Sequence, residues 1–284
     1  MLRGIGDTVT LANGVEMPRL GLGTYKSAEG GDVERAVTYA LELGYRGIDT
    51  ASMYGNEEGI GRALAARGVP RSEVFLASKV RNDEQGYDAT LAACERSLAR
   101  LGTDHLDLYL VHWYRTETPE TWRAMERLLA EGTVRAIGVC NHLEHHLEHL
   151  LANAAVVPMV NQYEFHPWLQ QPGLLGYCEG RDIVVQAWAP LMRGRVAEIP
   201  EIVEIGVRHG KTAAQVTLRW ILQHGVTTIP KSVHRERIAE NADVFDFQLT
   251  VDEMRAIDLL DRGERLGAHP DVGPRAAYRS IGAP

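Results

Sequence analysis

The chain has 284 residues, 45% of them hydrophobic and 24% charged, and its formal net charge is −8. These proportions are ordinary for a soluble globular protein of one or two domains, and they exclude a disordered, collagen-like or membrane-spanning chain. The acidic balance and the lack of a basic stripe argue against a nucleic-acid partner.

The N-terminal residues lack the apolar segment of a secretory signal, and no run of about 18 apolar residues could cross a membrane. The three cysteines, Cys94, Cys140 and Cys178, are irregularly spaced, which fits neither a disulfide framework nor a zinc motif. Unpaired thiols are normal in a reducing compartment. We therefore expect a cytoplasmic protein without a membrane partner.

A β-hairpin is predicted first, because Asn13-Gly14 lies between the segments Val9–Leu11 and Glu16–Met17 and both turn residues tolerate a positive φ. Short apolar segments then alternate with longer amphipathic ones. The predicted strands are Leu20–Thr24, Tyr45–Asp49, Val74–Lys79, Leu106–His112, Ala136–Val139, Met159–Gln162, Ile183–Ala187 and Thr227–Pro230.

The segments between these strands carry apolar residues at helical spacing, as Val33, Ala36, Val37 and Ala40 do. The predicted helices are Val33–Leu43, Glu57–Arg67, Ala89–Leu101, Thr118–Ala130, Leu143–Leu151, Leu174–Glu179, Ala213–Gln223, Arg235–Ala242 and Asp252–Leu260.

Two of the strands, LDLYLVHW at 106–113 and DIVVQAWA at 182–189, are apolar on both faces, which is typical of a parallel sheet covered on both sides. Eight strand–helix units predict an α/β fold, a (β/α)8 TIM barrel forming one domain over residues 1–284. The alternative is an open doubly wound sheet. Residues 262–284, rich in Gly, Pro and charge, are predicted to form an irregular C-terminal loop or tail near the active-site mouth.

Barrels carry their chemistry at the C-terminal ends of the strands. Asp49, Lys79 and His112 each end a predicted strand, and Tyr54 lies in the loop after Asp49. Each alone has an ordinary explanation: a helix cap, a lysine reaching solvent, a core histidine. Their convergence at one mouth predicts a catalytic site.

These side chains suit proton donation by a phenol. A free tyrosine has a pKa near ~10, and a neighbouring Lys79 cation would lower it. Asp49 would keep Lys79 charged, and His112 would bond to a carbonyl oxygen. Such a site polarises a carbonyl and protonates the alkoxide, while a separate donor supplies hydride.

A second site is predicted after the last strand, where residues 229–241 read IPKSVHRERIAEN and open a helix. In barrels this loop and the following helix N-terminus commonly bind phosphate. Lys231, Ser232, His234, Arg235 and Arg237 offer charge and donors. The alternative is a solvated basic helix start.

The sequence resembles the aldo-keto reductase family, most closely its bacterial 2,5-diketo-D-gluconic acid reductase branch. The resemblance runs from about Val9 to Asp261 and includes MPRLGLGTYK, GYRGIDTASMYGNEEGIG, LDLYLVHW, IGVCNH, VNQYEFHP, QAWAPL and IPKSVHRERIAEN. It implies reduction of aldehydes or ketones with NADPH, NADH being a weaker alternative, and no metal. It also implies that Asp49, Tyr54, Lys79 and His112 form a catalytic tetrad with Tyr54 as the acid.

The resemblance further implies how the cofactor is held. Asn141 and Gln162 would bind the nicotinamide carboxamide, and Trp188 would stack on the nicotinamide ring. Leu191 and its neighbours would contact the pyrophosphate. Lys231, Ser232 and Arg237 would clamp the 2′-phosphate, with Glu240 and Asn241 at the adenine. The predicted cofactor-binding residues are Gly23, Thr24, Tyr25, Asp49, Cys140, Asn141, Gln162, Trp188, Ala189, Leu191, Arg193, Gly194, Lys231, Ser232, Val233, His234, Arg237, Glu240 and Asn241.

Four positions depart from the family pattern. Cys140 replaces a common serine, and a thiol is a weaker donor, so looser nicotinamide binding is expected. His234 replaces a frequent arginine, which predicts a less strict preference for NADPH. Met192 stands where the family has glycine. Arg81 stands where a pocket tryptophan is common.

Arg81 predicts a polar or acidic carbonyl substrate, such as a keto-sugar acid; the alternative is that its side chain points to solvent. The predicted substrate-binding residues are Tyr25, Met53, Tyr54, Arg81, His112, Trp113 and Tyr114.

The sequence leaves three other functional interpretations. Residues 145–149, HHLEH, match the H-x-x-E-H pattern of one group of zinc peptidases, but an exterior helix would not hold the ion, and we expect no metal. A metal-dependent barrel hydrolase would need more histidines and carboxylates at strand ends. The remaining alternative is an NADP(H)-binding barrel that acts as a sensor or partner subunit without significant turnover. We expect a monomeric reductase acting on a small carbonyl.

Overall fold

The computed structural model describes residues 2–273, and its centre is a sheet of eight parallel strands. The strands follow one another around the sheet in chain order, each parallel to the next. They are β3 Gly21–Gly23, β4 Gly47–Asp49, β5 Phe75–Val80, β6 Leu108–Val111, β7 Ile137–Cys140, β8 Val160–Glu164, β9 Val184–Trp188 and β10 Thr227–Thr228.

The first and last strands of this sheet meet and close it into a barrel. Leu20 pairs with Thr228 and Gly23 pairs with Lys231 through parallel bridges. The N–H of Gly23 also donates to the carbonyl of Pro230 at 3.2 Å. The predicted (β/α)8 barrel is therefore confirmed, and the open doubly wound alternative is wrong. The last strand is shorter than predicted: Ile229 still donates to the carbonyl of Ala187 on β9 at 3.4 Å, and Pro230 has no N–H with which to continue the ladder.

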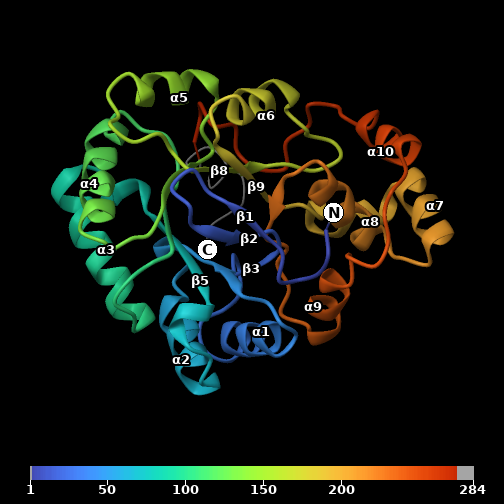
Figure 1. Ribbon diagram of the computed structural model, residues 1–284, viewed down its shortest axis with the longest axis horizontal. Coiled ribbons are helices and arrows are strands. Elements are labelled where there is room, and N and C mark those ends of the chain that lie inside the picture. Colours follow the sequence, from blue (N-terminus) through green and yellow to red (C-terminus); the bar gives the residue numbers. More distant parts are fainter. Residues whose placement is uncertain (1, 274–284) are drawn as a thin grey trace, which may run out of the picture.

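Helices surround the strands as an outer ring (Figure 1). They are α1 Gly31–Glu42, α2 Glu57–Arg67, α3 Tyr87–Leu101, α4 Thr118–Ala130, α5 Glu144–Leu151, α6 Pro172–Glu179, α7 Pro200–His209, α8 Ala213–Gln223, α9 Arg235–Ala242 and α10 Val251–Asp258. Only α7 was not predicted, although Pro200 in its first turn and Gly210 after its last turn are ordinary start and stop signals.

Every second side chain of a strand points into the barrel, and near the N-terminal ends of the strands these side chains are apolar. The predicted hairpin is confirmed: β1 Thr8–Thr10 pairs antiparallel with β2 Glu16–Pro18 and lies across the middle of the ring (Figure 1). Leu11 and Met17 of this hairpin pack with the inward side chains Phe75, Ala77, Leu108, Leu110, Ala136 and Met159. The hairpin therefore plugs the N-terminal end.

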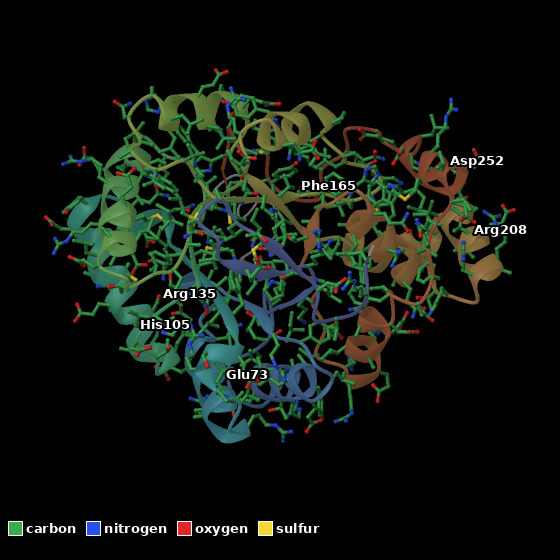
Figure 2. The ribbon with its side chains drawn as sticks, in the orientation of Figure 1. Glu73, His105, Arg135, Phe165, Arg208 and Asp252 are labelled. Carbon is green, nitrogen blue, oxygen red and sulfur yellow. The ribbon has the colours of Figure 1, made fainter. Side chains whose placement is uncertain are left out.

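A second apolar layer lies between the strands and the helices. Phe165 lies inside the molecule, whereas Arg208 and Asp252 project outward from α7 and α10 (Figure 2). The Phe165 ring stacks on Trp220 of α8 with centroids 5.3 Å apart. Within residues 2–273, no helix has the length and apolar character needed to cross a bilayer.

Residues 262–273, called the strap below, contain no helix or strand and cross the C-terminal ends of β8 and β9. The N–H groups of Arg262 and Glu264 donate to the carbonyl of Trp168 at 3.2 and 3.0 Å. The N–H of Leu266 donates to Glu164, the last residue of β8. The rest of the predicted tail, 274–284, lies outside the described residues.

Closure of the barrel depends on a close approach at Gly23. A β-carbon there would lie 2.5 Å from the carbonyl oxygen of Ile229, a backbone atom that cannot move aside. We predict that Gly23→Ala lowers the free energy of unfolding by about 1–3 kcal/mol through overpacking. Thermal unfolding followed by circular dichroism measures this. Gly6→Ala adds the same methyl in open space and is the control; equal melting temperatures for the two variants would contradict the prediction.

Candidate active site

The predicted catalytic side chains come together at the C-terminal end of the barrel. On β5 the inward series Phe75, Ala77, Lys79 changes from apolar to charged as the strand reaches this end. Asp49 ends β4 and lies in register beside Ala77. Tyr54 ends the short 3-10 helix Ser52–Tyr54 that follows β4.

A buried ion pair lies at the centre of this group. The Lys79 Nζ is 2.6 Å from Oδ1 of Asp49 and donates to the carbonyl of Thr50 at 2.8 Å. The side chains of Lys79 and Asp49 are 0% and 6% exposed. The second oxygen of Asp49 accepts from Nε2 of Gln162 at 2.8 Å. Buried charges persist when they are paired and their other polar atoms are satisfied, as here.

This pairing decides the charge of Lys79. Burial by itself would lower the pKa of Lys79, but the carboxylate of Asp49 raises it above its ordinary value. The ammonium therefore stays charged. Its nitrogen lies 5.1 Å from the centroid of the Tyr54 ring, so a fixed positive charge faces the phenol.

Two opposite effects act on Tyr54. Burial raises the pKa of Tyr54, and the charge of Lys79 together with its hydrogen bond lowers that pKa; burial is the larger effect, so the pKa lies above its ordinary value. The predicted lowering of the Tyr54 pKa rested on Lys79 alone and is therefore wrong in its net direction. The phenol is consequently protonated at neutral pH, as a proton donor must be.

His112 follows β6 and faces Tyr54 edge-on, with ring centroids 5.7 Å apart. Burial and the nearby charge of Lys79 lower the pKa of His112 to about 3, so its imidazole is neutral at physiological pH. Its Nδ1 is buried and has no hydrogen-bond partner among the described residues. A neutral imidazole can donate one hydrogen bond to an oxygen atom without transferring a full charge.

The amide of Gln162 connects three neighbouring strands. It donates to Asp49 and, at 2.7 Å, to Oε1 of Gln186, a residue that the sequence analysis did not single out. Its oxygen accepts from the Cys140 thiol at 3.5 Å. Cys140, Gln162 and Gln186 are register neighbours on β7, β8 and β9. A lone glutamine inside the apolar segment DIVVQAWA was the signal available for Gln186.

Asn141 and Trp188 contact each other at the rim of the barrel. The indole Nε1 of Trp188 donates to Oδ1 of Asn141 at 2.9 Å, and Nδ2 of Asn141 donates to the carbonyl of His112 at 3.1 Å. Asn141 has a positive φ of 56°, which asparagine tolerates better than most residues. The indole is half-buried, and its plane is fixed at its N–H edge.

The loop after β9 contains several left-handed residues. Ala189, Met192 and Arg193 have φ values of 52°, 51° and 57°, and Gly194 has φ 96°. Met192 therefore has a backbone conformation that glycine, the residue of the family pattern, adopts without strain. In methionine this conformation costs about 1 kcal/mol. Leu191 accepts the N–H of Gly194 at 2.8 Å, which folds this loop tightly beside the barrel mouth.

The basic residues just before α9 and in its first turn divide into paired and unpaired cations. Arg235 forms an ion pair with Glu42 at 2.6 Å. Lys231 and Arg237 are exposed and form no ion pair within residues 2–273. The Ser232 hydroxyl accepts the N–H of His234 at 3.1 Å and orders the turn.

Four further predicted cofactor residues lie after β3 or near α9: Thr24, Val233, Glu240 and Asn241. Thr24 is buried, and its N–H and hydroxyl both donate to the carbonyl of Asp49. Val233 is half-buried. Glu240 accepts from the Thr212 hydroxyl at 2.6 Å, and Asn241 is buried.

Aromatic side chains line the mouth beside Tyr54. The Tyr25 ring is 44% exposed and lies 5.0 Å from the Tyr54 ring, and Met53 precedes Tyr54 in the same 3-10 helix. Trp113 is buried, and its carbonyl accepts from Gln85. Arg81 is exposed and forms a two-bond ion pair with Asp83, both bonds 3.0 Å long.

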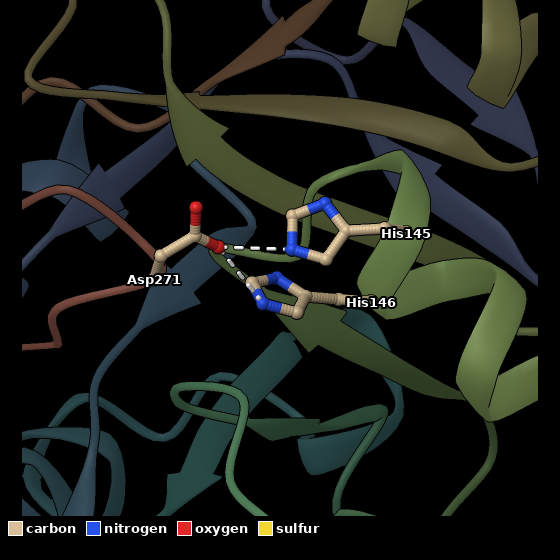
Figure 3. A group of neighbouring side chains, drawn as sticks. All are labelled: His145, His146 and Asp271. Atoms are coloured by element: carbon tan, nitrogen blue, oxygen red, sulfur yellow. Dashed lines mark hydrogen bonds and ion pairs between the residues drawn. The ribbon is translucent and has the colours of Figure 1, made fainter.

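Tyr114, which follows β6, packs against histidine rings of α5. Its hydroxyl bonds to Nδ1 of His149 at 2.9 Å, and its ring stacks on His146 at 4.1 Å. Oδ1 of Asp271 in the strap lies 2.9 Å from Nε2 of His145 and 3.1 Å from Nε2 of His146 (Figure 3). His145 and His149, the two histidines of the H-x-x-E-H pattern, bond to different partners, Asp271 and Tyr114.

These contacts fix which nitrogen of His146 carries the proton. The N–H of Leu143 donates to Nδ1 of His146 at 3.2 Å, so the ring proton is on Nε2 and is donated to Asp271. Burial lowers the pKa of His146 to about 4, so the ring stays neutral. A metal ion on Nε2 would need that proton moved to Nδ1, with loss of the Leu143 bond. The group ties the strap to α5 by hydrogen bonds.

The barrel mouth thus holds a buried Lys–Asp pair, a protonated phenol and a neutral imidazole. A sequence profile of the Aldo/keto reductase family matches residues 19–262. The chain belongs to the aldo/keto reductase family. It is an oxidoreductase, and the family predicted from the sequence motifs is confirmed.

Relatives cover nearly the whole chain. A glyoxal reductase of Bacillus subtilis is 52% identical over 266 residues, 93% of this chain and 96% of its own. An aldo-keto reductase from a Medee basin deep-sea metagenome library has a TM-score of 0.91 at 43% identity, covering 93% and 98% of the two chains. A Bombyx mori aldo-keto reductase solved with NADP has a TM-score of 0.88 at 32% identity, covering 95% and 97%.

The buried ion pair yields a stability prediction. Asp49→Asn keeps the shape of the side chain but leaves the Lys79 ammonium without a counter-ion, and breaking a buried pair costs about 3–5 kcal/mol. We predict a loss of this size in chemical denaturation. Asp83→Asn removes the partner of the exposed Arg81 and should cost at most about 1 kcal/mol. Similar losses for both variants would contradict the central role of the buried pair.

Proposed function

We propose that the protein reduces an aldehyde or ketone to an alcohol with NADPH, and that Tyr54 is the general acid. The observation that carries the proposal is the contact between the buried Lys79–Asp49 pair and the protonated phenol of Tyr54. A charged ammonium beside this half-buried phenol stabilises the phenolate left after proton transfer and does not ionise the phenol beforehand. A sensor or partner subunit would not need this pairing.

The residues around the mouth fit a nicotinamide nucleotide carrying a 2′-phosphate. The half-buried indole of Trp188 offers a flat face for the nicotinamide, the Asn141 amide bonds to that indole, and the Gln162 amide bonds to Asp49. Lys231 and Arg237, unpaired within the described chain, suit the 2′-phosphate, with Ser232 and the turn at His234 between them. When bound, the nucleotide supplies hydride to the carbonyl carbon.

The protein's own part of the reaction is to hold and protonate the carbonyl oxygen. His112, neutral because of burial, donates a hydrogen bond to that oxygen and orients it. The Tyr54 hydroxyl gives its proton to the oxygen as negative charge develops there. Lys79 stabilises the resulting phenolate, and Asp49 keeps Lys79 charged and in place. Tyr25 and Trp113 exclude water from the reacting group.

The substrate is proposed to be a small polar or acidic carbonyl compound. Asp83 accepts from Nε and Nη2 of Arg81, so an acidic substrate would either compete with Asp83 there or bind at Nη1. A dicarbonyl such as glyoxal is also a candidate, since one relative is named for that activity. NADPH oxidation assayed with matched acidic and neutral carbonyls separates these classes; no turnover despite NADPH binding would favour the sensor alternative.

The acid role of Tyr54 can be tested directly. Tyr54→Phe removes the proton donor and leaves the ring, so we predict a fall in kcat of at least about 100-fold with an unchanged Kd for NADPH. Steady-state kinetics and fluorescence titration measure the two quantities. Tyr39→Phe, in α1 and away from the mouth, is the control. A near-wild-type kcat would refute the assignment.

The phosphate clamp makes a separate prediction. Arg237→Ala should raise the KM for NADPH about tenfold, because a charge-assisted hydrogen bond to phosphate is lost. The KM for NADH, which lacks the 2′-phosphate, should change little. Arg235→Ala is the matched control because Arg235 is paired with Glu42. An equal effect on both nucleotides would contradict the clamp.

A further inference from the structure

Glu164 is a buried carboxylate that the proposed reaction does not use. It ends β8, its side chain is 0% exposed, and Nε2 of His166 lies 3.1 Å from its Oε1. Its other contacts are backbone donors of the strap: the N–H of Leu266 at 2.6 Å and the N–H of Gly267 at 3.1 Å. A buried carboxylate that accepts backbone N–H groups fixes the path of that backbone, because leaving the charge unsatisfied is costly.

The strap is held against Trp188 by this contact. Glu164 and Trp188 are register partners on β8 and β9, so their side chains point to the same side of the sheet. A β-carbon on Gly267 would lie 2.4 Å from Cη2 of Trp188 and 3.2 Å from Oε2 of Glu164. Only glycine therefore fits between the carboxylate and the outer edge of the indole.

The indole is thus fixed at two opposite edges. Asn141 accepts its Nε1 at 2.9 Å, and the strap backbone at Gly267 closes against its six-membered ring. The other side of the strap is held as well, since Nη2 of Arg193 donates to the carbonyl of Leu266 at 3.1 Å. Arg193 belongs to the left-handed loop after β9, so the strap contacts both the indole and this loop.

We propose that Glu164 is a positioning residue for the cofactor: by holding Leu266 and Gly267, it sets the indole plane of Trp188 on which the nicotinamide lies. This inference rests on the proposed function, because it requires a nicotinamide at Trp188. The strap then acts on the nicotinamide end of the nucleotide. The adenine end, at Lys231 and Arg237, is held by a different part of the barrel.

The experiment compares a whole nucleotide with a fragment that lacks nicotinamide. Glu164→Gln weakens the carboxylate anchor, and Gly267→Ala pushes the strap and indole apart. We expect each to raise the Kd of NADPH about tenfold, as the loss of about one charge-assisted hydrogen bond would. Binding of adenosine 2′,5′-bisphosphate, which reaches only the adenine end, should change less than about twofold. Equal weakening of both ligands would overturn the positioning role, because a general structural loss affects both ends of the nucleotide.

Two matched controls and the wild type complete the design. Glu264→Gln removes a carboxylate from the exposed side of the same strap, where it pairs with Arg195 at 3.8 Å. Gly176→Ala adds a methyl group in open space. Both should bind NADPH as the wild type does. If the wild type reduces carbonyls but Glu164→Gln and Gly267→Ala bind NADPH normally, the positioning role is refuted. If the wild type neither binds NADPH nor turns over, the proposed function itself is refuted.

Discussion

A charge buried inside a barrel is stable only if its counter-ion is buried there too. This constraint organises the side chains at the C-terminal end of the barrel. Lys79 is fully buried, so Asp49 must lie within bonding distance, and it does at 2.6 Å. The second oxygen of Asp49 then needs a donor, which Gln162 supplies. The amide nitrogen of Gln162 also donates to Gln186, and its amide oxygen accepts from the Cys140 thiol. One buried cation therefore accounts for a polar layer that spans β4 to β9.

The same burial sets the protonation states that the reaction needs. His112 is buried and Tyr54 is half-buried, and burial favours the neutral form of each. A neutral phenol can give a proton, and a neutral imidazole can donate a hydrogen bond. Lys79 alone keeps its charge, because Asp49 compensates it. The site thus combines one permanent charge with two neutral donors, and this division follows from which group has a counter-ion.

The repeating strand–helix pattern and the Asp49–Lys79 pair between neighbouring strands were predictable from the sequence, whereas the degree of burial and the contacts of the strap were not. Alternating strands and helices predicted the fold, and residues such as Asp49 and Lys79 at strand ends predicted the mouth. The net direction of the Tyr54 pKa was wrong because the degree of burial appears only once the barrel is closed. The strap has no periodicity, and its backbone N–H groups contact Glu164 whatever its side chains are. Sequence patterns do not encode such backbone contacts.

The buried cysteines have a practical consequence for attaching the enzyme to a surface. Cys94, Cys140 and Cys178 are all buried, and burial raises the pKa of Cys94 to about 12 and of Cys178 to about 11. None presents a reactive thiolate to a maleimide reagent. Ala12, by contrast, is exposed in the hairpin turn that plugs the end of the barrel opposite the mouth. A single cysteine introduced at Ala12 would therefore give one attachment point, with every immobilised molecule oriented mouth outward.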